Sequence, residues 1–72
     1  MKISYYPDTD SMYIDLSHRK SANSRKISPG VVLDCDADGN LVGIDICNAS
    51  TKLDLKELVL NRIPASQSTI AA

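Results

Sequence analysis

Hydrophobic and polar residues alternate along most of the first 47 positions, which is the period of a β-strand. The pattern is clearest over residues 30–50, which read GVVLDCDADGNLVGIDICNAS. Two apolar runs there flank Asp38-Gly39, a dipeptide typical of tight β-hairpin turns. The pattern therefore predicts two antiparallel strands joined near Gly39.

The register of this hairpin follows from its apolar residues, because strand side chains alternate between two faces of a sheet. If Ala37 faces Asn40, three apolar pairs form on one face: Val31 with Ile46, Leu33 with Ile44 and Cys35 with Val42. A one-residue bulge at Gly39 would instead place Asp45 opposite Val31. Each apolar cross-strand pair contributes about 0.2–1 kcal/mol. We therefore expect the first register, with a loop of two or four residues.

Three shorter strands are predicted before the hairpin, over residues 2–6, 11–17 and 25–28. Pro7 begins a turn between the first two, because proline presets the backbone angle that such a turn needs. A four-residue loop there pairs Tyr5 with Met12, and it brings the apolar side chains of both strands to one face.

The period changes after Asn48, where a helix is predicted. Residues 54–57 read DLKE, which is close to a capping box, and Pro64 ends the helix. A start at Ser50 or Thr51 is an open alternative. One helical face carries the aliphatic residues Leu55, Leu58, Val59 and Ile63.

The predicted fold is α+β, a five-stranded antiparallel β-meander with one C-terminal helix packed on one face. Residues 1–63 form a single small domain, and residues 64–72 form a disordered C-terminal tail. One helix covers only one face of a sheet, so apolar side chains on the other face stay exposed. The interface candidates on that face are Tyr13, Ile27, Val32 and Leu41.

Such patches mark interfaces, so we expect a homodimer, a small protein partner, or both. The size of the chain points the same way. Its 72 residues contain neither Trp nor Phe, and a core this small commonly needs a disulfide, a metal or a partner subunit.

Cysteine usage and hydropathy bear on location. Cys35 and Cys47 are predicted on opposite faces of the sheet and are not expected to form a disulfide. Two free thiols and no visible signal peptide are typical of the cytoplasm. The longest apolar run is too short to cross a bilayer, so no membrane association is expected.

Four aspartates of the hairpin resemble a calcium-binding loop in their spacing: Asp34, Asp36, Asp38 and Asp45. The usual loop has a bidentate Glu where Asp45 stands, and it is flanked by helices rather than strands. We favour solvent-facing and turn roles for these carboxylates. Calcium or small-ligand binding is the alternative.

A basic stretch over residues 18–26 contains Arg19, Lys20, Arg25 and Lys26. It could contact phosphate or nucleic acid. The net charge of −1 and the absence of interleaved aromatic residues favour a solvated loop and a charged edge strand instead. Arg25 is expected to pair with Asp34 on the neighbouring strand.

No catalytic site is predicted. His18 is the sole histidine, and no Ser or Cys can be placed beside it as a nucleophile. Asp8, Asp10 and Asp15 are acids without a predicted cleft. We expect no cofactor and a non-catalytic protein-interaction module.

Several motifs together resemble domain-of-unknown-function family 2283, a family of small prokaryotic proteins. They are Ile3-Ser4-Tyr5-Tyr6-Pro7, Asp10, Tyr13-Ile14-Asp15-Leu16-Ser17 and residues 27–50. The chain departs from the family pattern at Cys35, Cys47 and Asn48. The resemblance implies the fold, a cytosolic prokaryotic origin and an antitoxin-like role, and it brings no established activity.

Overall fold

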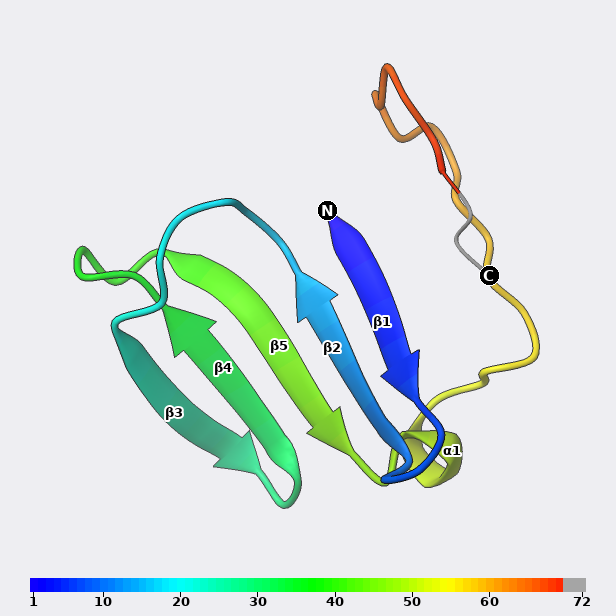
Figure 1. Cartoon of the computed structure of the whole chain (residues 1–72), viewed down its shortest axis with the longest axis horizontal. Coiled ribbons are helices and arrows are strands. Elements are labelled where there is room, and N and C mark those ends of the chain that lie inside the picture. Colours follow the sequence, from blue (N-terminus) through cyan, green and yellow to red (C-terminus); the bar gives the residue numbers. More distant parts are fainter. Residues whose placement is uncertain (70–72) are drawn as a thin grey trace.

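The computed structural model describes residues 1–69, which form one antiparallel sheet and a single helical turn (Figure 1). The elements are β1 (Lys2–Tyr6), β2 (Ser11–Asp15), β3 (Asn23–Ser28), β4 (Val31–Cys35), β5 (Leu41–Cys47) and α1 (Ala49–Lys52). The five predicted strands are confirmed, with β2 two residues shorter than expected and β3 beginning two residues earlier.

The strands lie in the order β1-β2-β5-β4-β3, so the predicted meander is wrong. In a meander, β2 would pair with β3, whereas here β5 lies between β2 and β4 (Figure 1). The composition of the strands explains this order. Ile44 and Ile46 of β5 each have an apolar partner on both sides, whereas every residue of β3 is exposed. The apolar strand takes the centre and the polar, basic strand takes an edge.

The predicted registers are confirmed through most of the sheet. Ile3 pairs with Ile14 and Tyr5 with Met12. Across β4 and β5, the predicted pairs Val31–Ile46 and Leu33–Ile44 are also present.

The register changes at the tip of the β4–β5 hairpin. Cys35 pairs with Leu41 rather than with Val42, so the loop is residues 36–40 and the predicted even-numbered loop is wrong. The carboxylate of Asp36 stabilises this longer loop. It accepts hydrogen bonds from the backbone N–H of Asp38 (3.0 Å) and Asn40 (2.8 Å), and Gly39 adopts a left-handed φ of 86°.

The registers divide the sheet into two unlike faces. We call one the aliphatic face, formed by two rows of cross-strand neighbours: Ile3, Ile14, Ile44 and Leu33, then Tyr5, Met12, Ile46 and Val31. We call the other the polar face, which carries Ser4, Tyr13, Asp15, Ser24, Val32, Asp34, Gly43 and Asp45.

The core is thin. Among the described residues, the buried apolar side chains are Val42, Ile46 and Ala49. Val42 and Ile46 lie on the same side of β5 as Ile44, whereas the other members of the two apolar rows are half-buried or exposed.

The predicted helix over residues 54–63 is wrong. The helix present is the four-residue α1, which ends before that segment begins, and residues 53–63 have neither helix nor strand. Isolated helices shorter than about 12–15 residues are marginal in water. Leu58 and Val59 are 70% and 71% exposed, so no packed surface offsets the cost of helix formation.

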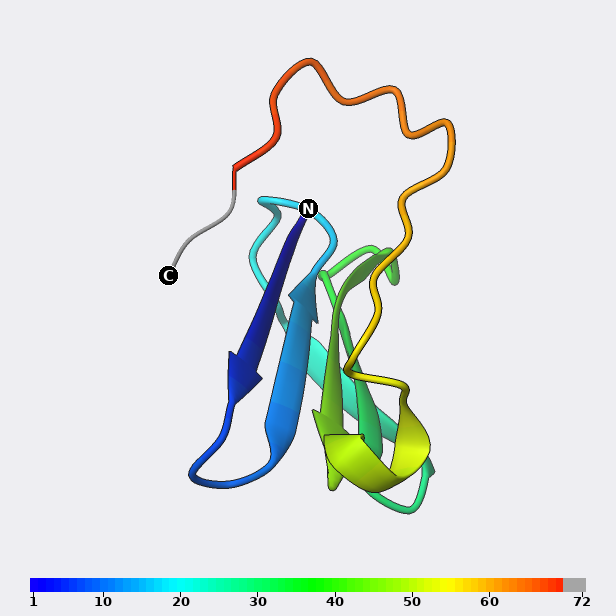
Figure 2. The same cartoon turned by 90° about the vertical axis from the view of Figure 1, so that its right-hand side faces the viewer.

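The segment that follows α1 rises beside the sheet (Figure 2), and in Figure 1 it lies beyond β1 rather than over the other strands. It therefore does not supply the covering helix that the sequence pattern predicts. Residues 64–69 have no regular secondary structure. The predicted tail also includes residues 70–72, which lie outside the described residues.

No helix within residues 1–69 has both the length and the apolar composition that a membrane span requires. The two cysteine thiols are free, as expected, with Cys35 half-buried and Cys47 exposed.

Candidate interaction surfaces

The aliphatic face is the largest ordered apolar feature of the sheet. Its two rows cross four adjacent strands, from β1 to β4. Ile3 and Tyr5 at the β1 edge are 43% and 42% exposed, and the remaining members apart from Ile46 are half-buried. A contiguous apolar surface of this kind is typical of a site where another polypeptide binds.

The polar face is organised by one tyrosine that reaches across a glycine. Tyr13 lies on β2, and its hydroxyl donates a 2.7 Å hydrogen bond to Oδ2 of Asp34 on β4. The ring crosses β5 at Gly43, where an added Cβ would lie 2.6 Å from Cζ of Tyr13 and closer still to the hydroxyl oxygen. Gly43 is therefore required for the space it leaves, and its φ is not in the left-handed region.

Ser24 on β3 completes this network, because its hydroxyl donates a 2.7 Å hydrogen bond to the other oxygen of Asp34. The network thus links β2, β4 and β3 across the face of β5. Both carboxylate oxygens of Asp34 are engaged inside the chain.

The electrostatics of the polar face keep Tyr13 protonated. The hydrogen bond to Asp34 raises the pKa of Tyr13 to about 12, with further contributions from burial and from the nearby carboxylates of Asp15 and Asp45. At neutral pH the phenol is therefore protonated and donates the hydrogen bond to Asp34. The network is suited to holding strands together.

Asp10 connects the β1–β2 turn to the start of α1. Its carboxylate accepts hydrogen bonds from the hydroxyl of Tyr5 (2.8 Å) and from the hydroxyl (2.6 Å) and backbone N–H (3.1 Å) of Ser50. Its backbone carbonyl accepts from the N–H of Ala49 (2.8 Å). The hydrogen bonds from Ser50 and Tyr5 lower the pKa of Asp10.

Sequence reasoning missed this role, because it treated Asp10 as an ordinary turn acid. Asp10 and Ser50 are 40 residues apart, so no local spacing indicates that they meet. Asp adopts a left-handed φ, here 52°, more readily than most residues. That preference is the feature of the local sequence that could have indicated a structural role for Asp10.

The predicted interface residues do not form one patch. Tyr13 and Val32 share the polar face and are half-buried. Ile27 lies at the register shift of β3 near the start of β4, whereas Leu41 lies opposite the last residue of β4. All four stay predicted contact residues. The apolar side chains that the fold gathers are on the opposite face.

The four aspartates of the calcium-like spacing have separate surroundings. Asp34 is held by Tyr13 and Ser24, Asp36 stabilises the loop, Asp38 lies at the tip of that loop, and Asp45 lies beside Tyr13 on the polar face. Within residues 1–69, no three His, Cys, Asp or Glu side chains are grouped closely enough to hold a metal ion.

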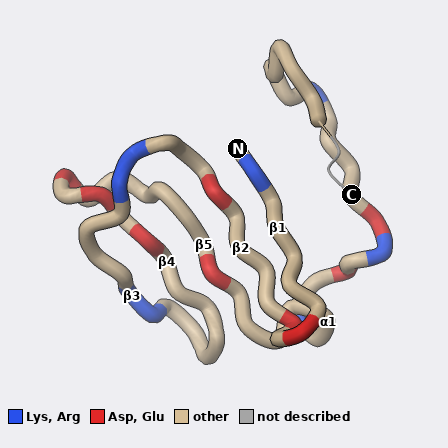
Figure 3. Tube along the Cα trace, in the orientation of Figure 1, with Lys and Arg blue, Asp and Glu red and all other residues tan. Residues whose placement is uncertain are grey.

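The basic residues are likewise dispersed (Figure 3). Arg19 forms an ion pair with Asp36, with 3.5 Å between Nε and Oδ2, while Lys20 lies in the same loop. Arg25 pairs with Leu33 and Lys26 with Val32, so these two side chains point to opposite faces. The predicted Arg25–Asp34 pair is wrong, because the register places Ser24 opposite Asp34.

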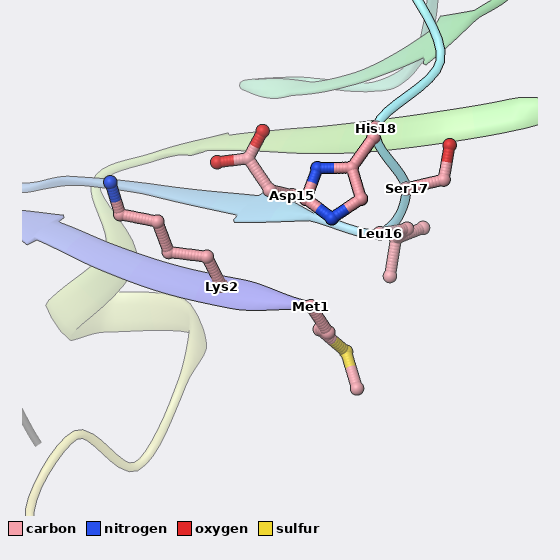
Figure 4. Close-up of a pocket in the computed structure, with 6 residues that line it drawn as sticks. All are labelled: Met1, Lys2, Asp15, Leu16, Ser17 and His18. Carbon is pink, nitrogen blue, oxygen red and sulfur yellow. The ribbon is translucent and has the colours of Figure 1, made fainter. Parts of the chain in front are cut away.

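A small hollow lies where β1 begins and β2 ends (Figure 4). Its lining combines Asp15, Ser17 and His18 with Met1, Lys2 and Leu16. The hydroxyl of Ser17 accepts hydrogen bonds from the backbone N–H and Nε of Arg19. Among the described residues, no hydrogen bond joins Ser17 to His18.

No curated protein and no solved structure is significantly similar to the chain. A family model does match, over residues 2–50, which run from β1 to the beginning of α1. The exposed segment after α1 lies beyond the matched region. Because the match spans more than half of the chain, this protein belongs to the family described as Protein of unknown function (DUF2283), the family that its motifs resemble.

Proposed function

We propose that the protein is a non-catalytic protein-interaction module that self-associates or binds a small protein partner through its aliphatic face. The observation that carries the proposal is the exposure of that face: two apolar rows cross four strands, and Ile46 is their one buried member. Removing apolar surface from water contributes about 25 cal/mol per Å². A partner that covers this face would thus bind with a favourable hydrophobic term.

The polar face supports a non-catalytic role. Its central tyrosine and aspartate satisfy each other's hydrogen-bonding groups, and the raised pKa of Tyr13 keeps the phenol neutral. Enzymes generally hold a nucleophile or base close to its working protonation state in a cleft. Neither condition is met by this pair.

The proposal has a more specific, antitoxin-like form. In it, the partner is a small toxin-like protein of the same cell, and the aliphatic face masks the partner's active surface. Family resemblance supports this form, and the free, exposed thiol of Cys47 supports a reducing cytoplasm as its location. Co-expression tests it, since rescue of growth from a neighbouring toxic gene is the expected result.

A matched pair of substitutions on β1 tests the use of the aliphatic face. Ile3→Ser removes an exposed side chain from that face, and Tyr6→Ser removes one from the opposite face. We expect Ile3→Ser to weaken association about tenfold, which corresponds to about 1.4 kcal/mol, and Tyr6→Ser to change it less than twofold. Sedimentation equilibrium and affinity capture from cell extract measure both.

Two results would contradict the proposal. One is equal association of both variants and the unsubstituted chain. The other is an unsubstituted chain that remains monomeric at high concentration and captures no protein from extract.

A further inference from the structure

We infer that the occupant of the aliphatic face is a second copy of this chain, and that residues 53–63 of each copy cover that face on the other. The inference rests on the proposed function and names the partner and the covering segment. Three observations support it: the accessible area of the whole chain, the exposure of residues 53–63, and the path that this segment follows after α1.

The chain exposes more surface than a folded monomer of its mass. Its accessible area is 6036 Å², whereas a compact protein of 7.8 kDa exposes about 4,400 Å². Its radius of gyration is 13.1 Å, against about 11 Å for a compact chain of this length. The excess of roughly 1,600 Å² includes the exposed residues 64–69 as well as the segment 53–63, and it exceeds the roughly 800 Å² per partner of a standard interface.

Every residue of the segment 53–63 is exposed. Six large apolar side chains of the segment are exposed: Leu53, Leu55, Leu58, Val59, Leu60 and Ile63. Within residues 1–69, the backbone from residue 54 onward makes no hydrogen bond to another backbone group. Exposed apolar side chains are unfavourable in water, so covering them would stabilise the chain.

The segment lies against only the β1 edge of its own sheet, where Leu58 and Ile63 line a groove together with Ile3 and Tyr5. Ser50 is bound to Asp10, and the ammonium of Lys52 donates to the carbonyl of Cys47, so α1 is held at one end of the sheet. From there the segment runs on the β1 side, away from β3 and β4 (Figures 1 and 2). It borders an open groove with Ile3 and Tyr5 on the β1 wall.

A symmetric pair of chains satisfies both surfaces at once. Each copy has one aliphatic face and one apolar segment. If the segment of each copy binds the face of the other, the two contacts are equivalent and form a closed two-fold dimer. The net charge of −1 causes little repulsion between copies.

Single substitutions in the 72-residue chain test the segment. Leu58→Ser removes a 70% exposed apolar side chain, and Asn61→Ser is the matched control in the same segment. We expect the unsubstituted chain to be a dimer by sedimentation equilibrium, with association weakened about tenfold by Leu58→Ser and less than twofold by Asn61→Ser.

Mixing two variants tests reciprocal exchange directly. Ile3→Ser damages the face and Leu58→Ser damages the segment, so each homodimer has two damaged contacts. A heterodimer of the two retains one intact contact between segment and face. We expect the mixture to associate about threefold more tightly than either variant alone, because each of the two equivalent contacts accounts for half of the free energy of a tenfold loss.

The outcomes separate this inference from the proposed function. If the chain dimerises and Leu58→Ser has no effect, exchange is overturned while the protein-interaction role stands. If Leu58→Ser instead lowers the melting temperature of a monomer, the segment covers its own sheet and the inference is wrong. A monomer that captures a different protein through Ile3 also overturns it and leaves the proposed function intact.

Discussion

The two faces of the sheet hold neighbouring strands together by different interactions, hydrogen bonds on the polar face and apolar contacts on the aliphatic face. On the polar face, Tyr13 reaches over Gly43 to Asp34, and Ser24 binds the remaining carboxylate oxygen. On the aliphatic face, apolar rows lie side by side, and most of their members are only half-buried. The polar face is hydrogen-bonded within one chain, whereas the aliphatic face is the surface through which we propose that a partner binds.

This difference separates two properties of the protein. Changes on the polar face should lower the free energy of unfolding of each chain and leave association unaffected. Changes on the aliphatic face and in residues 53–63 should lower association. The following substitutions test this separation on the polar side, from the largest expected effect to the smallest.

Gly43→Val should have the largest effect. Even a Cβ at this position lies 2.6 Å from Cζ of Tyr13, so the ring must move and its hydrogen bond to Asp34 is lost. Overpacking typically costs about 1–3 kcal/mol, and we expect a loss of about 3 kcal/mol in the free energy of unfolding when the hydrogen bond is included. Urea unfolding measures it.

A double variant provides the control for that effect. Tyr13→Ala in the Gly43→Val background removes the clash, so part of the lost stability should return. Gly39→Val is a poor comparison, because Gly39 has a positive φ and would be strained for that reason alone. If Gly43→Val leaves the urea midpoint unchanged, the ring does not lie across β5.

Tyr13→Phe should have an intermediate effect. The ring keeps its place over Gly43, and only the hydrogen bond to the Asp34 carboxylate is removed. We expect a loss of about 1 kcal/mol, near the usual net value for one hydrogen bond. Ser24→Ala, which removes a more exposed donor to the same carboxylate, should cost less.

Alkaline pH tests the same hydrogen bond. The pKa of Tyr13 is raised in the folded chain to about 12, from an ordinary value of 10.0. A raised pKa means that the folded state favours the protonated phenol, so this stability is fully present below pH 10 and is lost as the pH rises toward 12. Urea midpoints should fall over that interval, and less steeply in Tyr13→Phe.

Asp10→Asn should have the smallest effect and should appear in acid. The hydrogen bonds from Ser50 and Tyr5 lower the pKa of Asp10 in the folded chain. Its contribution is therefore present above the ordinary carboxyl pKa of 3.8 and is lost as the pH falls through the lower folded value. The variant should flatten this part of the acid unfolding curve.

Asn is a suitable replacement because it tolerates the left-handed φ that Asp10 adopts. An acid unfolding curve identical to that of the unsubstituted chain would show that Asp10 does not anchor α1.

Local patterns predicted the pairing of neighbouring strands because each register aligns apolar residues on one face. The pairs Ile3–Ile14 and Leu33–Ile44 could both be predicted in this way. The position of β5 between β2 and β4 could not. That choice depends on comparing the apolar content of all strands at once, which alternation within one strand does not reveal.

The candidate site was predicted less completely for a similar reason. The acids were recognised, but their partners lie on other strands: Tyr13 meets Asp34 across β5, and Asp10 meets Ser50 across 40 positions of sequence. The aliphatic helical pattern of residues 54–63 was also recognised, yet it does not form a helix without a surface to pack against.

The sequence alone determined that the chain is a small antiparallel sheet, which strands pair as hairpins and which residues share a face, because the two-residue period of a strand is a local property. Tertiary structure alone decided the strand order, the bond that crosses Gly43 and the state of residues 53–63. These features depend on which elements are neighbours in space. The neighbours in turn depend on how the apolar side chains of all strands are buried together.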